Sequence, residues 1–340
     1  MMKFRHLLTL FVASALAAVL QASILSSFDA ESTYALEADT PTDAALVNIP
    51  FNAELDRPTV RPASVEQSDN PHEGARAVVG RDDREPVLTR SFPWLAVGRL
   101  EWQYEGEPVQ TCTATLIGPD TVLSNSHCLL LPYREDGKET DIFIDANRYA
   151  RLKASGKEVP QLVFKPGMIN GIAKDESAIA HYKTGWTVDN FDPAEDWSVM
   201  TLEVPLGEKY GYLGWRKLDL SDDAILALLA EKSQVIGYAL DFPTEELRAF
   251  GEVGTTAGVD SSCSILGISQ SGDLKDTIVH DCDTNSGTSG GPILSKFDDG
   301  QYYIIGLHAR RIPLSKMVRL PNGIRTRVVN GGVEVSRWAD

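Results

Sequence analysis

A serine enclosed by glycines, in the hexapeptide Gly287–Pro292 (Gly-Thr-Ser-Gly-Gly-Pro), constrains this chain more than any other feature. Glycines let the backbone turn sharply and let another carbonyl group approach closely. A serine hydroxyl becomes a nucleophile only when a base takes its proton, and acyl transfer also requires backbone N–H groups that hold the oxyanion. Taken alone, the hexapeptide fits a simple Gly-Pro turn equally well.

A candidate for that base is His127, which stands directly before Cys128 and shortly after the apolar pair Val122-Leu123. Cys112 lies 16 residues before Cys128, in a segment whose partial alternation indicates a strand. A bridge between the two cysteines would tie this strand to the loop of His127, and would contribute about 3 kcal/mol in the loop-entropy model. The alternative is a structural histidine beside a disulfide.

An acidic residue, Asp196, directly precedes the strand-like run Trp197–Leu202. A carboxylate in such a place can hold an imidazole in one tautomer and stabilise its charged form. Asp192 and Glu195 lie in the same short loop, but only Asp196 adjoins the strand. We therefore expect Asp196 to be the partner of the histidine.

The order histidine, aspartate, serine, the Cys-to-His-Cys spacing and the Gly-x-Ser-Gly-Gly-Pro motif together resemble the chymotrypsin-like serine peptidases, over about residues 77–335. The resemblance implies an all-β fold of two antiparallel six-stranded β-barrels with the active site in the cleft between them. It implies His127 as general base, Asp196 as its orienting group and Ser289 as nucleophile. It also implies an oxyanion hole formed by the backbone N–H groups of Gly287 and Ser289.

The pattern of short runs separated by Gly, Pro, Asn and Asp clusters independently favours an all-β fold. We expect strands over residues 94–102, 109–117, 141–144, 161–164, 198–204, 233–240, 277–280, 291–294 and 302–308. The segment Ser221–Lys232 differs, because an N-cap, acidic residues in the first turn and strong helix formers predict a helix. We place this helix on the surface between the two barrels.

The N-terminus has the form of a secretory signal, with basic residues followed by the apolar run Leu7–Leu20, which is too short for a membrane span. We expect residues 1–22 to be a signal peptide. Residues 23–76 are rich in acidic residues, Pro, Ser and Thr, and we expect a largely disordered propeptide that is removed by a cut after Arg76. An uncut linker is the alternative. Residues 77–340 would form one peptidase domain.

Four cysteines in an exported chain fit two disulfides, and Cys263 with Cys282 would staple the segment that leads into the Ser289 loop. Buried thiols are the alternative. No Cys/His set has the spacing of a zinc site and no loop has a calcium-site pattern, so we expect no metal and no cofactor. The net charge of −16 suits a soluble exported protein and does not favour nucleic-acid binding; nothing in the sequence specifies an oligomeric state.

The residue before the serine, Thr288, departs from one branch of the family. Pancreatic-type members carry an aspartate there, which pairs with the new N-terminal amine after activation. Since Thr288 has no charge, activation must work differently here. This departure, the opening Val78–Val87 and the run His280–Thr284 resemble the bacterial glutamyl-endopeptidase-like branch.

Two residues point to different substrates. His308 matches the histidine that lines the specificity pocket of glutamyl endopeptidases, where an imidazole donor can bind a glutamate carboxylate; a core histidine is the alternative. Asp283 lies six residues before Ser289, the spacing of the aspartate that trypsin-like members use for Arg and Lys. Arg310 and Arg311 either add positive potential or face solvent.

We expect an exported serine endopeptidase that acts on polypeptides and prefers Glu or Asp before the scissile bond. The alternatives are cleavage after Arg or Lys through Asp283, and a non-catalytic binding homologue.

Overall fold

The computed structural model describes residues 46–69, 71, 84–135, 138–143, 151, 154–155, 160–187, 189–270, 272–320, 323 and 325–339. The expected signal peptide, residues 1–22, and the expected cut after Arg76 lie outside these residues. Every described residue belongs to one compact unit, Asp43–Asp340.

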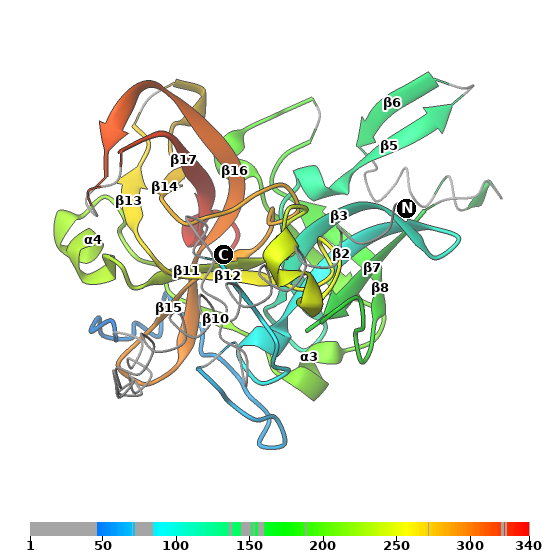
Figure 1. Cartoon of the computed structure of the whole chain (residues 1–340), viewed down its shortest axis with the longest axis horizontal. Helices are drawn as coiled ribbons and strands as arrows, with labels where there is room; N and C mark the ends of the chain where they lie inside the picture. The colour runs from blue at the N-terminus through cyan, green and yellow to red at the C-terminus, as the bar shows by residue number, and fades with distance from the viewer. Residues whose placement is uncertain are drawn as a thin grey trace, which may run out of the picture. The chain divides into compact units, whose positions relative to one another are not determined.

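Six antiparallel strands close into a barrel in the order β2-β3-β4-β9-β8-β7 (Figure 1). Their bounds are β2 Val97–Tyr104, β3 Glu107–Leu116, β4 Thr121–Ser124, β7 Gln161–Pro166, β8 Ser177–Thr184 and β9 Ser198–Leu202. In β9, Ser198, Met200 and Leu202 are buried while the residues between them are half-buried, as expected for a strand with one face on a core. The first barrel predicted from the sequence is therefore confirmed.

The second half of the fold is a nine-stranded sheet, whose main path runs β1-β12-β11-β15-β16-β17-β14-β13, with β10 pairing in parallel to β16. The bounds are β1 Glu85–Pro86, β10 Gly214–Trp215, β11 Ser233–Gly237, β12 Gly258–Cys263, β13 Ile265–Ile268, β14 Ile278–His280, β15 Pro292–Lys296, β16 Tyr302–Arg319 and β17 Arg325–Glu334. Only Ser264 separates β12 from β13, so the chain links a strand near one end of the path directly to the strand at its other end.

This sheet has nine strands where six were expected, because β1 and β10 add to it and Ser264 divides β12 from β13. One of its strands, β16, extends over 18 residues. Each of the segments predicted as strands overlaps an observed strand. Residues 94–96, at the start of the first of them, form the short 3-10 helix η1 instead. A separate hairpin joins β5 Leu130–Glu135 and β6 Lys138–Phe143.

Within the described ranges the helices are short. Their bounds are η1 Trp94–Ala96, η2 His127–Leu129, η3 Pro193–Glu195, α3 Leu206–Tyr210, α4 Asp223–Leu229, η4 Glu245–Phe250, η5 Gly272–Leu274 and η6 Val335–Arg337. The predicted helix is α4, which begins after the N-cap Asp222, whose side chain accepts a hydrogen bond from Ala224 N. It packs on β13, and its partly buried Ile225 and Leu226 contact the core of the second sheet, so it does not lie between the barrels. None of the helices in the described ranges is long and apolar enough for a membrane crossing.

Residues 46–69, which we call the N-terminal strap, are folded against the domain, so the expectation of disorder is wrong for this part of residues 23–76. Val47 is buried in the core of the second sheet, and Val65 is buried in the main hydrophobic cluster. Asp56 forms an ion pair with the buried Arg216. Isolated bridges join Val47 to Phe297, Arg57 to Trp215, Val60 to Tyr212 and Gln67 to Phe92. Val47 and Val65 therefore anchor the strap, although its composition resembles that of a disordered segment.

One hydrophobic cluster spans both halves of the fold. It includes Leu116 and Leu123 of the barrel together with Leu294, Ile304 and Leu307 of the second sheet. Because these side chains pack together, loops that leave either half are held in a fixed relation to one another.

Candidate active site

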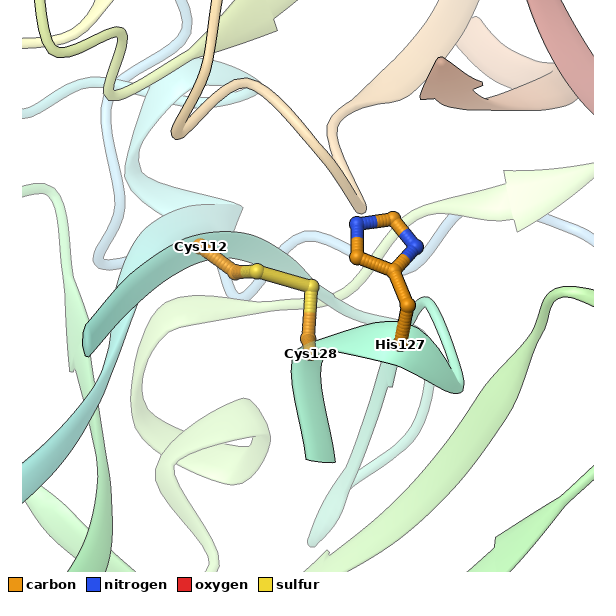
Figure 2. Close-up of side chains that lie close together, drawn as sticks. All are labelled: Cys112, His127 and Cys128. Carbon is orange, nitrogen blue, oxygen red and sulfur yellow. A yellow bond between two sulfur atoms is a disulfide. The ribbon is translucent and has the colours of Figure 1, made fainter. Parts of the chain in front are cut away.

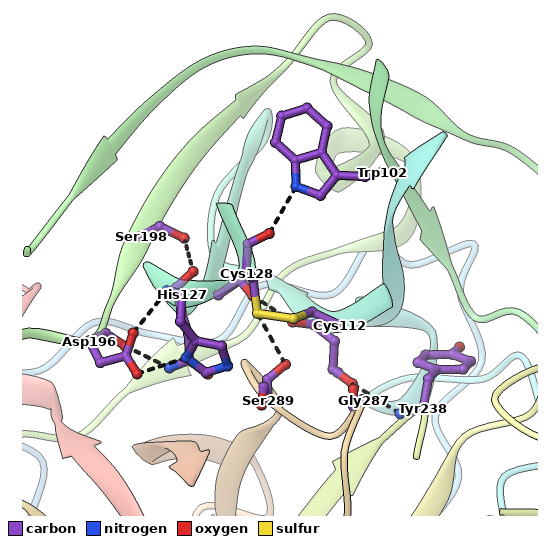
Figure 3. The surroundings of a disulfide bond; sticks show 12 residues. Trp102, Cys112, His127, Cys128, Asp196, Ser198, Tyr238, Gly287 and Ser289 are labelled. Carbon is purple, nitrogen blue, oxygen red and sulfur yellow. Dashed lines mark hydrogen bonds and ion pairs between the residues drawn. A yellow bond between two sulfur atoms is a disulfide. The ribbon is translucent and has the colours of Figure 1, made fainter. Parts of the chain in front are cut away.

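The disulfide predicted between Cys112 and Cys128 is present, and it joins β3 to the η2 turn that begins with His127 (Figure 2). The backbone around the turn is further fixed, since Trp102 Nε1 donates to Cys128 O at 3.0 Å (Figure 3). Ser198 of β9 donates its hydroxyl to Asn125 O at 3.0 Å. The histidine therefore stands on a loop that is tied to three strands of the barrel, β2, β3 and β9.

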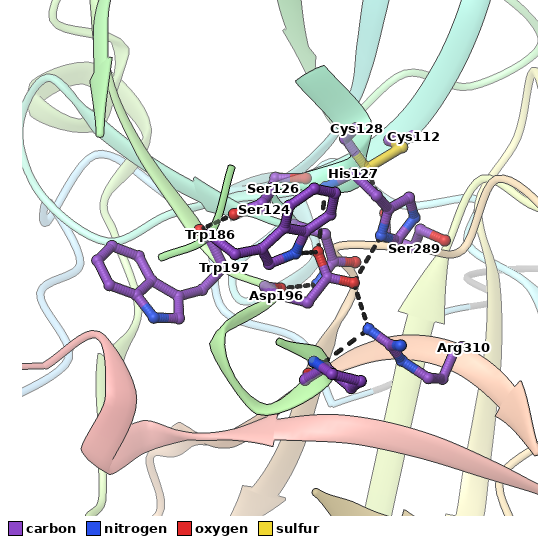
Figure 4. Close-up of polar contacts among 12 residues, drawn as sticks. Cys112, Ser124, Ser126, His127, Cys128, Trp186, Asp196, Trp197, Ser289 and Arg310 are labelled. Carbon is purple, nitrogen blue, oxygen red and sulfur yellow. Dashed lines mark hydrogen bonds and ion pairs between the residues drawn. A yellow bond between two sulfur atoms is a disulfide. The ribbon is translucent and has the colours of Figure 1, made fainter. Parts of the chain in front are cut away.

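The Asp196 carboxylate contacts both the ring and the backbone of His127. His127 Nδ1 lies 2.8 Å from Asp196 Oδ2, and His127 N donates to Oδ1 at 3.0 Å. Two further groups donate hydrogen bonds to the carboxylate: Trp186 Nε1 to Oδ1 at 2.9 Å and Arg310 Nη2 to Oδ2 at 2.7 Å (Figure 4). A carboxylate that is only 1% exposed is thus fully hydrogen-bonded, as burial of a charge requires.

The same contacts determine the ionisation of Asp196. Burial opposes the charged form, but the charge and hydrogen bonds of His127, and then the charge of Arg310, outweigh it, so the pKa of Asp196 lies below its ordinary value. Asp196 is consequently a carboxylate at neutral pH.

Ser289 lies in a loop that both halves of the fold hold. Thr113 of β3 donates its N–H to Ser289 O at 2.8 Å, and Gly290 N donates to His308 O of β16 at 2.9 Å. Gly290 has φ +81°, and a Cβ on it would lie 2.1 Å from Ser124 Oγ, so only glycine fits between the loop and the barrel. Figure 4 shows Ser289 beside the His127 ring, on the side away from Asp196. The structure brings the three predicted residues together.

The backbone N–H groups of Gly287 and Ser289 find no acceptor among the described residues, whereas Thr288 N donates to Asn285 O at 3.0 Å. Gly287 has φ +93°, and Thr113 Oγ1 donates to its carbonyl at 2.8 Å, which fixes the orientation of this peptide (Figure 3). These two N–H donors are thus left for a ligand.

His308 lies buried next to a second buried histidine. His308 Nδ1 and His280 Nε2 are 3.1 Å apart, and the two rings meet edge to face. Burial lowers the pKa of His280 to about 3. Burial, and then the charges of His280, His127 and Arg310, hold the pKa of His308 well below its ordinary value. Both imidazoles are neutral at neutral pH.

The tautomers follow from a buried ring nitrogen of His280. His280 Nδ1 is buried and has no hydrogen-bond partner within the described residues. An unpaired lone pair is less costly there than an unpaired N–H. We therefore assign the His280 proton to Nε2, where it is donated to His308 Nδ1, which leaves the His308 proton on Nε2.

Asp283 stands beside another carboxyl group. Its N–H donates to Asp260 Oδ2 at 2.7 Å, and it follows the second predicted disulfide, Cys263–Cys282, which is also present. Burial, opposed by hydrogen bonds from the N–H groups of Asp283 and Ser262 and reinforced by the charges of Asp283 and Asp281, raises the pKa of Asp260 to about 6.

Cys112, His127 and Cys128 bring three potential metal-ligand atoms within 4.8 Å of one another (Figure 2). The two sulfur atoms are bonded to each other, so neither is available as the thiolate that zinc requires. This cluster is therefore not a metal site.

Arg310 is the site residue whose role sequence reasoning missed, since we left open whether it faces solvent. It lies two positions after His308 on β16, but the pairing with β17 shifts between these two residues, so strand alternation does not predict where its side chain lies.

A family model described as a trypsin-like peptidase domain matches residues 112–307, more than half of the chain. The chain belongs to this family. It is a serine endopeptidase. The match begins at Cys112 and ends at Leu307, so the N-terminal strap, β1, β2 and β17 lie outside it.

No curated protein matches the peptidase. Among solved structures, a Glu endopeptidase in complex with MPD is 20% identical, with a TM-score of 0.49, covering 76% of this chain and 93% of that chain. A thermostable serine protease, AL20, from an extremophilic microorganism is 15% identical, with a TM-score of 0.43, covering 71% of this chain and 91% of that chain. Likenesses of this extent say nothing about the substrate of the peptidase.

Proposed function

We propose that this peptidase cleaves polypeptides through an acyl-enzyme on Ser289, with His127 as general base and Asp196 as the group that orients it. The observation that carries this proposal is the 2.8 Å contact between His127 Nδ1 and Asp196 Oδ2, with Ser289 on the opposite side of the ring. A proton held on Nδ1 by Asp196 leaves the other ring nitrogen, Nε2, as a lone pair for the serine hydroxyl.

In the first step His127 Nε2 takes the hydroxyl proton while Ser289 Oγ bonds to the substrate carbonyl carbon. The N–H groups of Gly287 and Ser289 hold the oxyanion of the tetrahedral intermediate. The imidazolium, stabilised by the ionised Asp196, then gives its proton to the leaving amine as the C–N bond breaks. Water repeats the sequence, with His127 taking its proton, and the acid product leaves Ser289.

We propose that the enzyme acts after export. Two disulfides favour an oxidising compartment, and the first 22 residues have the pattern of a secretory signal.

A preference for Glu or Asp before the scissile bond is supported by His308. Because His308 Nδ1 accepts a hydrogen bond from His280, the Nε2–H group of His308 remains as a donor for a substrate. A glutamate or aspartate carboxylate is a strong acceptor for such a donor. Because the buried His308 ring is neutral, it can donate this hydrogen bond without a counter-ion from the protein.

The alternative, cleavage after Arg or Lys, is favoured by the acidic surroundings of Asp283. Asp260 accepts a hydrogen bond from the N–H of Asp283, so the Asp260 carboxyl group lies close to Asp283. Its negative charge would add to the attraction of Asp283 for a cationic side chain. One pocket cannot easily serve both charges, so the two preferences are mutually exclusive.

Matched peptides that differ only in having Glu, Gln, Arg or Phe before the scissile bond test both levels of the proposal. We expect the Glu peptide to have the highest kcat/KM, and Ser289→Ala to lose all cleavage. His308→Ala should lower kcat/KM for the Glu peptide at least tenfold while retaining cleavage of the Phe peptide. Preference for the Arg peptide, lost in Asp283→Asn, would replace the acidic preference with the alternative. No turnover of any peptide would leave the third possibility, a binding homologue.

A further inference from the structure

Arg310 connects the two halves of the fold at the proposed triad. It lies on β16 of the second sheet, while Asp196 follows η3 and precedes β9 of the barrel. The guanidinium Nη2 donates to Asp196 Oδ2 at 2.7 Å and is 3.5 Å from Pro193 O in η3 (Figure 4). The loop that carries Asp196 is thereby held to the opposite half of the molecule.

Local structure directs Arg310 to this place. The pairing of β16 with β17 shifts between His308 and Arg310, and such irregularities re-aim side chains. On the partner strand, Gly331 leaves room for the arginine stem, because a Cβ there would lie 3.2 Å from Arg310 Cγ. The guanidinium also lies over the Phe191 ring, 5.7 Å from its centroid.

Arg310 and His127 share one carboxylate oxygen, since their nitrogens lie 2.7 and 2.8 Å from Asp196 Oδ2. A fixed positive charge so close to the ring disfavours the imidazolium form. Other charged or titratable groups nearby are Glu195 of η3, which pairs with Arg337 of η6, and the buried His308 of β16. Of these, Arg310 alone donates to the carboxylate that faces the imidazole.

We propose that Arg310 is a positioning residue that fixes the Asp196 carboxylate. Its positive charge also opposes protonation of the His127 ring, so that protonation requires a lower pH than it would without the arginine. The proposal rests on the proposed function of His127 as base. Its consequence is that the enzyme retains its free base, and thus its activity, at a more acidic pH than Asp196 alone would allow.

Histidine titration by NMR in the purified, ¹⁵N-histidine-labelled protein tests the charge effect without requiring activity. We expect the midpoint for His127 to move upward by about half a pH unit or more in Arg310→Gln, from the Coulomb interaction of charges at this separation. Arg310→Met, which keeps an apolar stem against Phe191, should show the same shift. Arg310→Lys should reverse at least half of it. An unchanged midpoint in both neutral variants would overturn the proposal.

The matched control is Arg311→Gln, because Arg311 is the exposed neighbour on the same strand and has no salt bridge in the described part of the chain. It removes the same charge and should leave the midpoint in place. An equal shift in this control would reduce the effect to general surface charge and would also overturn the proposal.

The second readout is the rate of inactivation by a small fluorophosphonate as a function of pH, which requires no residue preference. Its acidic limb should move with the NMR midpoint in each variant. If the parent protein is not inactivated at any pH, the proposed peptidase mechanism fails, whereas the NMR midpoint still decides the role of Arg310.

Discussion

Asp56 and Arg216 form a buried ion pair, with Arg216 Nε 2.7 Å from Asp56 Oδ2, that fastens the N-terminal strap to the end of β10. The side chains are 3% and 1% exposed, and Arg216 also donates to the carbonyl oxygens of Ile49 and Pro50. The guanidinium lies 4.3 Å from the centroid of the Phe297 ring. The strap thus supplies the charge and the acceptors that a buried arginine of the domain requires.

We expect Asp56→Ala to lower the free energy of unfolding by about 3–5 kcal/mol, because it leaves Arg216 buried without its counter-ion. Urea unfolding measures this loss. The control is Asp69→Ala, which removes the partner of Lys296 from a site where Asp69 is 43% exposed, and should cost about 1 kcal/mol or less. Equal, small losses in both variants would contradict the anchoring role of Asp56.

The anchoring of the strap predicts that a cut after Arg76 does not release residues 46–69. A site for a sequence-specific protease, placed around Arg76 in the full chain, allows this to be measured by gel filtration before and after cleavage. We expect the two fragments to elute together in buffer and to separate only in denaturant. Elution of the N-terminal fragment by itself in buffer would show that the strap dissociates as a conventional propeptide.

The three residues that the sequence singled out as a catalytic set lie close together in the structure, because short local motifs identified them. His127, Asp196 and Ser289 each stand in a local pattern, and the barrel strands around them alternate or are apolar. By contrast, β17 was not predicted, because Asn330, Gly331 and Gly332 interrupt any alternation, and the strand is stabilised mainly by its pairing with β16.

Long-range contacts account for the remaining differences. The strap was assigned to disorder because its acidic and proline-rich composition was evident, whereas the partner of Asp56 lies 160 residues further along the chain. The role of Arg310 was left open for the same reason, since Asp196 lies 114 residues before it. Neither pairing leaves a mark on the local sequence.

The Cys112–Cys128 disulfide should support both stability and the placement of His127. We expect the double variant Cys112→Ala/Cys128→Ala to lose about 3 kcal/mol of unfolding free energy. Its inactivation rate with a fluorophosphonate should fall about tenfold or more, since small displacements of a catalytic base are costly. The comparison variant is Cys263→Ala/Cys282→Ala, with a similar loop of 19 residues and a similar expected loss of stability. A larger rate loss in this second variant would contradict the specific role of the first disulfide.

Asp260 should make the stability of the peptidase depend on pH. Its pKa in the folded protein is about 6, above the value of about 3.9 expected in the unfolded chain. Between these values the folded state binds more protons, so the contribution of this group to the free energy of unfolding falls as the pH rises from about 4 to 6. We expect Asp260→Asn to remove this decline, measured by urea unfolding at several pH values. Parallel pH profiles of the parent and the variant would contradict it.

The central claim, that Ser289 is the nucleophile activated by His127 and Asp196, is tested most directly by labelling the purified protein with a fluorophosphonate and identifying the modified residue by peptide mass spectrometry. The account predicts one adduct, on Ser289, that is absent in Ser289→Ala and formed at least about a thousandfold more slowly in His127→Ala. An unlabelled parent protein, or an adduct on another residue with Ser289 unmodified, would contradict it.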